Sequence, residues 1–328
     1  MTADLRQHLL DSRISGEVDT SRESNLRNID RMLAGADGAW FGLTHFRDWS
    51  AAEVLQVMVE QVGIRADPAY RSGTDTIDPD LTIAALVRWR ERLELAVRRR
   101  ERVLIATGHP GGVFQLHLDV AAALEQAGCE VLRPDVHDWL WPWDVDNDWT
   151  RRRPRHLRCL GGVHVLAAGG DVHHTHAPEP GRVLLEACSP DLVIADHGFA
   201  GAALTAGHEV LALADCNDPA LFVAQAEGRP VVTVPLDDNV RPHLYAPLSD
   251  FLLAGLLGTP QRGDAVSDLS LLRFLTVAEV AALMRVSRMT VYRLVHSGEL
   301  ASVRVGRSFR VPERTVHDYL RGAFTEAG

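Results

Sequence analysis

The sequence predicts an α/β fold, in which a helical N-terminal segment packs on a parallel, Rossmann-like three-layer sheet and a small domain follows at the C-terminus. Residues 101–257 alternate short apolar, β-branched runs with helical stretches, the pattern of a parallel sheet that is covered on both faces. Residues 258–270 are polar and contain Gly, Pro and Ser, which is typical of a linker. The chain of 328 residues also exceeds one ordinary core.

Composition excludes several protein classes. Hydrophobic residues make up 46% and charged residues 24% of the chain, as in globular proteins rather than disordered ones. The longest apolar run, 251–257, is far below the roughly 20 residues of a membrane span. The N-terminus lacks the apolar stretch of a secretory signal. We therefore expect a cytoplasmic protein that does not use a membrane.

Residues 1–100 are expected to be mainly helical. Ser50 precedes an apolar stretch that stops at Gly63, so this serine can cap a helix and the glycine can end it. Pro79 stands where the first turn of a second helix would tolerate it. We interpret residues 1–100 as a segment that packs on the α/β domain of residues 101–257.

Polar residues gather where the predicted strands end. Six successive strands are each followed by Asp or His. Ligands of open parallel sheets bind beyond the carboxyl ends of the strands. The sequence therefore predicts a cleft rich in carboxylates and imidazoles at one edge of the sheet.

The turn at residues 108–112, with the sequence GHPGG, is a candidate anion site. Its glycines permit close backbone approach, and the helix that follows presents its N-terminus. The turn matches neither GxGxxG nor a GKS/T loop, so no nucleotide cofactor is indicated. A phosphate-bearing small molecule is one interpretation, and a tight turn without ligand is the other. The predicted catalytic or ligand-binding residues are His109, Gly111, Gly112, Asp135, His137 and Asp218.

Metal binding is the second chemistry that suits the cleft. Asp and His are ligands for Zn, Mn, Fe or Mg, so the identity of a single divalent ion stays open. The alternative is that these side chains only cap helices and order loops. The predicted ligands are Asp171, His173, His176, Asp196, His197 and Asp215. The sequence contains no DxDxT or GxSxG motif, so it gives no support to a covalent hydrolase mechanism.

Three stretches of the α/β region, GHPGG, ADHGFAGAA and ADCNDPA, resemble a bacterial family labelled "phosphatase". The resemblance implies a phosphatase-like hydrolase and assigns no residue roles.

Charge separates the C-terminal region from the rest of the chain. Residues 271–328 contain nine arginines and five acidic residues, a net charge of +4, which leaves −14 for residues 1–270 because the whole chain carries −10. A basic tail on an acidic body indicates a polyanionic partner for the tail alone.

The C-terminal region predicts two short helices followed by a β-hairpin. Thr276 and Glu279 form a capping-box pattern before the first helix, and Ser287 precedes the second. The pattern across Leu275–Val311 resembles the excisionase-type helix-turn-helix family, which is related to the MerR-type winged helix. That resemblance implies a winged helix-turn-helix domain over 271–328 that binds duplex DNA.

The second helix and the hairpin carry the predicted DNA contacts. These residues are Ser287, Arg288, Met289, Thr290, Tyr292, Arg293, His296, Arg304, Arg307 and Arg310. A domain this short binds weakly alone, so we expect a homo-oligomer.

Three functions are compatible with the sequence, and a recombination accessory factor of the excisionase kind is the least favoured, because such factors need no 270-residue partner domain. The first is a transcriptional regulator whose body binds a small, phosphorylated ligand or a metal. The second is a metal-dependent, phosphatase-like hydrolase with a DNA-binding appendage. Phosphate release by the body would distinguish these two functions.

Overall fold

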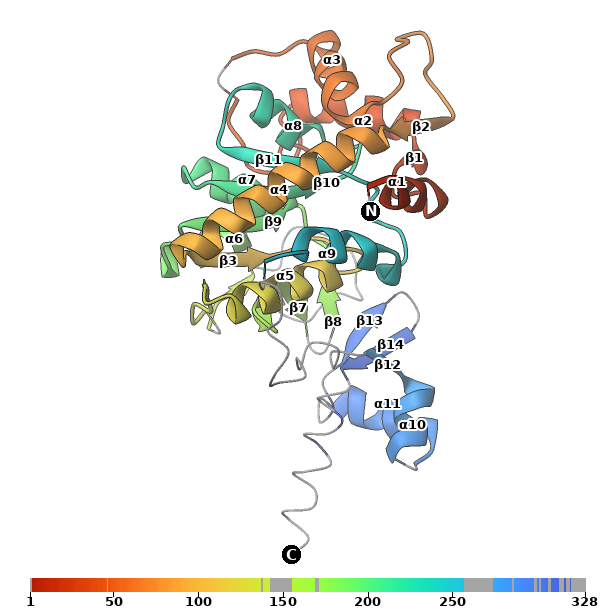
Figure 1. Cartoon of the computed structure of the whole chain (residues 1–328), viewed down its shortest axis with the longest axis vertical. Coiled ribbons are helices and arrows are strands. Elements are labelled where there is room, and N and C mark those ends of the chain that lie inside the picture. The colour runs from red at the N-terminus through yellow and green to blue at the C-terminus, as the bar shows by residue number, and fades with distance from the viewer. Residues whose placement is uncertain are drawn as a thin grey trace, which may run out of the picture. The chain divides into compact units, whose positions relative to one another are not determined.

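The computed structural model of the chain is shown in Figure 1. It describes residues 2–45, 47–136, 138–141, 155–168, 171–256, 274–284, 286–297, 302–305 and 308–312, together with positions 300, 316 and 319. The chain divides into two units. The first contains residues 1–136, 159–165 and 174–259, and the second contains residues 137–158, 166–173 and 260–328.

The N-terminal part of the first unit holds four helices and a small sheet. The helices are α1 (Thr2–Asp11), α2 (Arg22–Leu33), α3 (Ala51–Val62) and α4 (Pro79–Arg99). The capping box of Ser50 and Glu53 begins α3, and Gly63 ends it with a left-handed φ of 81°, as the sequence predicted. The segment is mainly helical, and it also contains a small sheet that the sequence did not predict, in which β1 (Gly16–Ser21) pairs antiparallel with β2 (Thr74–Ile77).

The central sheet of the first unit is built from parallel strands. β3 (Arg102–Ala106) pairs with β9 (Leu192–Asp196) on one side, and with β4 (Glu130–Val131) and β7 (Val163–Ala168) on the other. Next to β9 come β10 (Val210–Ala214) and then β11 (Val231–Pro235). The inner strands β9 and β10 are buried along their whole length. Their continuous apolar sequences are what a sheet covered on both faces requires.

Helices cover this sheet. α5 (Phe114–Gln126) connects β3 to β4, and α6 (Glu179–Ala187) precedes β9. α7 (His197–Thr205) and α8 (Pro219–Ala226) alternate with β9, β10 and β11 along the chain. A short 3-10 helix, η2 (Pro242–Tyr245), leads into α9 (Ala246–Leu253). Because β3, β9, β10 and β11 run parallel, the residues that follow these strands lie on one edge of the sheet.

The expectation of a purely parallel sheet is corrected by the second unit. There β5 (Leu140–Trp141) pairs antiparallel with β6 (Arg155–Leu160), and β8 (Asp171–His173) pairs antiparallel with the end of β7. The complete sheet is therefore mixed. The described residues contain no helix long and apolar enough to cross a membrane.

The C-terminal part of the second unit has its own core. β12 (Phe274–Thr276), β14 (Ser308–Pro312) and β13 (Val303–Val305) form a three-stranded antiparallel sheet. It is accompanied by α10 (Val277–Met284) and α11 (Arg288–Ser297). Thr276 and Glu279 make the predicted capping box, and Ser287 caps α11 through the Thr290 N–H. The buried side chains come from both helices and from the strands.

Candidate functional site

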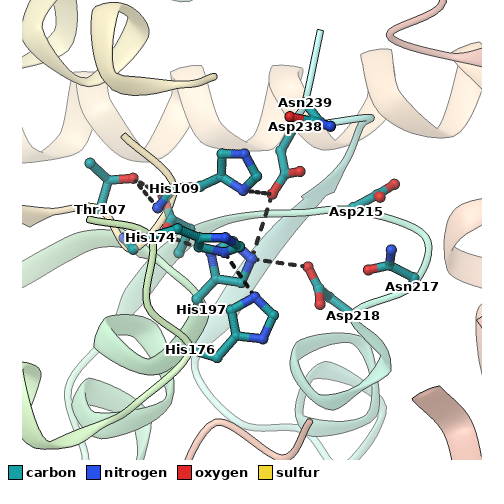
Figure 2. Close-up of polar contacts among 12 residues, drawn as sticks. Thr107, His109, His174, His176, His197, Asp215, Asn217, Asp218, Asp238 and Asn239 are labelled. Carbon is teal, nitrogen blue, oxygen red and sulfur yellow. Dashed lines mark hydrogen bonds and ion pairs between the residues drawn. The ribbon is translucent and has the colours of Figure 1, made fainter. Parts of the chain in front are cut away.

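Nine acidic and imidazole side chains meet at the carboxyl ends of four parallel strands of the first unit, and Figure 2 labels most of them. They end or follow β3, β9, β10 and β11, or come from the loop before α6. This strand-end cluster consists of His109, His174, His176, Asp196, His197, Asp215, Asp218, Asp237 and Asp238. Side chains at the ends of different parallel strands therefore converge at one edge of this sheet.

His197 is at the centre of the strand-end cluster. Its side chain is only 3% exposed, and its backbone has a left-handed φ of 46°, which is uncommon for a residue with a side chain. Nδ1 lies 3.1 Å from Asp196 Oδ1. Nε2 lies 3.3 Å from Asp218 Oδ2 and 3.6 Å from Asp238 Oδ2. The ring therefore bridges one carboxylate on its Nδ1 side and two on its Nε2 side.

Asp196 fixes the orientation of that ring. The carboxylate is 1% exposed and accepts hydrogen bonds from the Thr107 hydroxyl and the Gly108 backbone N–H, both at 2.5 Å. Burial raises the pKa of Asp196, but the hydrogen bond and charge of His197 outweigh it and hold the pKa below its usual range. An ionised Asp196 that is held by two other donors leaves His197 Nε2 directed at Asp218 and Asp238.

Charge balance in the centre depends on His197. Burial lowers the pKa of His197, but Asp218 and Asp196 outweigh it and raise the pKa well above its usual value. In turn, burial raises the pKa of Asp218, and His197 reverses the effect and lowers it. The imidazolium of His197 thus supplies the positive charge that the surrounding carboxylates need when no other cation is bound.

Three carboxylates form one end of the cluster. Asp215, Asp237 and Asp238 each offer an oxygen within 4.8 Å of the others. Asp215 accepts a hydrogen bond from the Thr20 hydroxyl at 2.6 Å. Burial raises the pKa of Asp215 well above its usual value, and the charges of Asp238 and Asp237 raise it further. Such crowding of buried carboxylates is stable only if protons or cations compensate it.

Imidazoles form the other end of the cluster. His174 Nε2 and His176 Nε2 are 2.9 Å apart, and the His176 ring stacks on His197 with a centroid distance of 4.4 Å. His109 Nδ1 is 3.1 Å from Asp238 Oδ2. Although His174 is exposed at one edge, the atoms packed around it lower its pKa to about 3, and the neighbouring imidazoles contribute. The His174 ring is therefore neutral and can act as a ligand.

Close packing, rather than a ligand, explains one predicted glycine. A Cβ at Gly112 would lie 1.8 Å from the Asp238 carbonyl oxygen, whereas a Cβ at Gly111 would meet nothing within 4 Å. Gly112 therefore permits the GHPGG turn to touch the loop that carries Asp238. The turn positions His109 against Asp238, and Gly111 has no packing constraint.

Three overlapping donor groups could hold a cation. They are His109–His174–His197, His197–Asp218–Asp238 and Asp215–Asp237–Asp238, and within each group the ligand atoms lie within 4.8 Å of one another. His197 is shared by the first two groups and Asp238 by the last two. Mixed carboxylate and imidazole donors suit Zn, Mn or Fe.

Not all predicted residues belong to these groups. Of the predicted metal ligands, His197 and Asp215 are members, His176 lies beside them, and Asp196 binds protein donors instead. Asp171 and His173 lie in β8 of the second unit and are half-buried. Asp135 is exposed beyond β4, and His137 lies outside the described residues. Three members were not predicted: His174, Asp237 and Asp238.

The predicted DNA contacts lie on α11 and on the strands β13 and β14 of the second unit. Four of them, Ser287, Arg288, Arg293 and His296, are exposed, and Met289 is 75% exposed. Thr290 is half-buried beside Ser287, and Tyr292 packs on the core with its ring centroid 6.0 Å from that of Phe309. Arg304 is in β13, half-buried Arg310 is in β14 and donates to the Phe309 carbonyl, and Arg307 lies outside the described residues.

Comparisons with known proteins assign both parts of the chain. A family model described as Phosphatase matches residues 1–258, and one described as a helix-turn-helix domain matches residues 274–323. A protein of Streptomyces coelicolor named as a phosphatase is 43% identical over 264 residues, which cover 77% of this chain and 96% of that protein. Two candidate DNA-binding proteins from strains of Mycobacterium tuberculosis are 70% identical over 56 residues, or 17% of this chain and 72% of theirs. No solved structure matches.

Proposed function

Because the chain belongs to the Phosphatase family, we propose that its first unit is a metal-dependent phosphatase that hydrolyses phosphate esters in the strand-end cluster. The observation that carries this proposal is the group of His197, Asp218 and Asp238, three buried donors from three strand ends with ligand atoms within 4.8 Å of one another. One divalent cation fits this group, because two carboxylate oxygens and one imidazole nitrogen are ligands that Zn²⁺ and Mn²⁺ accept.

The absence of arginine from the described contacts of the cluster favours a metal. Arginine is the usual side chain for binding phosphate, yet the contacts described for these nine residues include no guanidinium group. The carboxylates alone would repel a phosphate ester. A bound cation would reverse that charge, polarise a phosphoryl oxygen and lower the pKa of a bound water.

The protein's own residues prepare the site for that cation. Asp196 holds His197 by its Nδ1 so that Nε2 is presented as a ligand, an arrangement that commonly orients metal-binding histidines. Asp218 and Asp238 supply the negative charge. The GHPGG turn holds His109 beside Asp238.

Phosphate release by the full-length chain tests the proposal. We expect a generic aryl phosphate monoester to be hydrolysed with added Mn²⁺ or Zn²⁺, and hydrolysis to stop when the protein is stripped by a chelator. Asp218→Asn should reduce turnover by ~100-fold or more, because it removes a ligand charge. Asp250→Asn, an exposed position on α9, is the matched control. Equal turnover in stripped and metal-loaded protein would refute a metal-dependent reaction.

The C-terminal region supports a second function, binding of duplex DNA. We propose that α11 enters the major groove and that β13 and β14 act as the wing of a winged, MerR-like helix-turn-helix. Exposed Arg288, Arg293 and Met289 on α11 favour this assignment. Transcriptional regulation and self-association on paired DNA sites are parts of the same proposal.

We also propose how the helices are placed on the two faces of the sheet and where the domains begin and end. The path from β3 through α5 to β4 runs toward one edge of the sheet, and the path through β9, β10 and β11 runs toward the other. Right-handed crossovers would then place α5 on one face and α7 and α8 on the opposite face, as in a Rossmann-like doubly wound sheet. We keep the proposed domains at 1–100, 101–257 and 271–328, with a linker at 258–270.

A further inference from the structure

We propose that His174, His176 and His109 form a second cation site, of imidazole character, beside the cation that the proposed phosphatase would hold at His197, Asp218 and Asp238. The inference rests on the proposed function for the neighbouring ion. It adds a separate ligand set with a different metal preference, in the same cleft of the first unit.

The spacing of two ring nitrogens is the first argument. His174 Nε2 and His176 Nε2 lie 2.9 Å apart. Two imidazole nitrogens bound to one ion at about 2.1 Å would lie about 3.4 Å apart around a tetrahedral Zn²⁺, and about 3.0 Å apart at the right angle of an octahedral ion. The observed distance therefore lies within about 0.5 Å of the spacing of two adjacent ligands of one ion.

The second argument is the tautomer of His176. Its Nδ1 lies 2.6 Å from the Gly38 carbonyl oxygen, which can only accept a hydrogen bond, so Nδ1 carries the proton. In the neutral ring Nε2 then presents its lone pair toward His174. Metal-binding histidines commonly donate their other N–H to a backbone carbonyl in this way. The edge of Phe41, with a ring-centroid distance of 5.4 Å, further fixes the ring.

His109 completes the set. Its Nδ1 is buried and has no hydrogen bond of suitable geometry, although Asp238 Oδ2 lies 3.1 Å away. The ring centroids of His109 and His174 are 4.6 Å apart. His109 and His174 each offer a nitrogen to a donor group whose third member is His197, and the His176 ring stacks on His197. The Asp238 carboxylate beside Nδ1 orients the His109 ring, as a carboxylate commonly does for a metal-binding histidine.

The two sites would prefer different cations. Imidazole donors suit Zn²⁺, Fe²⁺ or Ni²⁺, whereas carboxylate donors suit Mg²⁺ and Mn²⁺. The His174 end of the cluster offers imidazoles and the Asp215 end offers carboxylates. We therefore infer that the cleft binds a borderline transition-metal ion at the imidazole end, and that Mg²⁺ does not compete for it.

Zn²⁺ titration of the full-length chain tests this inference. The protein is stripped with a chelator, kept in excess Mg²⁺ and titrated with Zn²⁺ while bound metal is measured by elemental analysis. We expect a high-affinity Zn²⁺ that Mg²⁺ does not displace, distinct from a cation held at His197, Asp218 and Asp238. His174→Ala and His176→Ala should each weaken it by at least ~100-fold, the upper range for losing an outer-shell partner. His208→Ala is the matched control, since His208 precedes β10 at the opposite end of that strand.

X-ray absorption of the Zn²⁺-loaded wild-type protein is the second measurement, and it does not depend on the folding of a variant. We expect scattering from at least two imidazole rings. Oxygen ligands alone, or unchanged Zn²⁺ affinity in folded His174→Ala and His176→Ala, would overturn the inference. Wild-type protein that holds Zn²⁺ through imidazoles but shows no phosphatase activity would instead refute the proposed function. The inferred imidazole site would then still stand.

Discussion

Replacing Asp196 by asparagine tests how the cluster is organised. Asp196 accepts hydrogen bonds from the Thr107 hydroxyl, the Gly108 N–H and His197 Nδ1. Asparagine keeps one oxygen and introduces an NH₂ group, which cannot accept any of these bonds. At least one buried donor is left without an acceptor, at a cost of about 1–3 kcal/mol. The loss of the charge also removes the partner that fixes the His197 ring.

We therefore expect Asp196→Asn to lower the free energy of unfolding by about 3 kcal/mol. This figure adds the cost of one buried donor without an acceptor to the cost of weaker hydrogen bonds from the other two donors. Cation affinity and turnover should fall by ~10–100-fold, as for other partners of metal-binding histidines. Urea unfolding, Mn²⁺ titration and phosphate release measure the three effects. Asp191→Asn is the control: Asp191 lies next to the opposite end of β9 and accepts one backbone N–H. Wild-type turnover and Mn²⁺ affinity in Asp196→Asn would refute this reasoning.

Three further predictions concern other parts of the chain. Arg288→Ala should weaken binding to a preferred DNA site by about 1–3 kcal/mol, measured by fluorescence anisotropy, with Arg98→Ala as a control and with affinity falling steeply as salt rises; a flat salt response would count against DNA binding. Burial lowers the pKa of His164 from 6.5 to about 4, so the unfolded chain takes up the proton first and stability is lost as the pH falls from 6.5 toward 4. The loss should be about 2 kcal/mol between pH 7 and pH 5 and should shrink by that amount in His164→Leu; equal pH dependence of urea unfolding in both proteins would contradict it. Asp75→Ala should cost about 3–5 kcal/mol because it leaves buried Arg22 without its charge partner, whereas Asp80→Ala, in an exposed pair, should cost under about 1 kcal/mol.

The strands and helices of the first unit were readable from sequence because their signals are local. Strands such as Leu192–Asp196 are continuous apolar runs, and Ser50 and Gly63 mark helix ends by side-chain and backbone chemistry. The sheet of β1 and β2 was missed for the opposite reason. Its strand Gly16–Ser21 is polar and forms by pairing with Thr74–Ile77, far along the chain. No local sequence pattern therefore predicts this strand.

The site was predictable as a region but not as a list of ligands. Strand ends identified the edge, yet side-chain direction beyond a strand depends on loop geometry. β8 ends at His173, so strand alternation does not predict the directions of the His174 and His176 side chains. The left-handed backbone of His197 and the contact of Gly112 with the Asp238 loop are likewise set by tertiary packing. The inclusion of both Asp237 and Asp238 in one donor group depends on the same packing.

Anomalous X-ray scattering from crystals of the full-length chain grown with Mn²⁺ tests the central claim most directly. The account predicts a Mn²⁺ peak about 2.0–2.2 Å from His197 Nε2 and from carboxylate oxygens of Asp218 and Asp238, a spacing usual for such ligands. The peak should disappear in Asp218→Asn and persist in Asp250→Asn. Well-ordered crystals at saturating Mn²⁺ with no peak among these three residues would contradict the account.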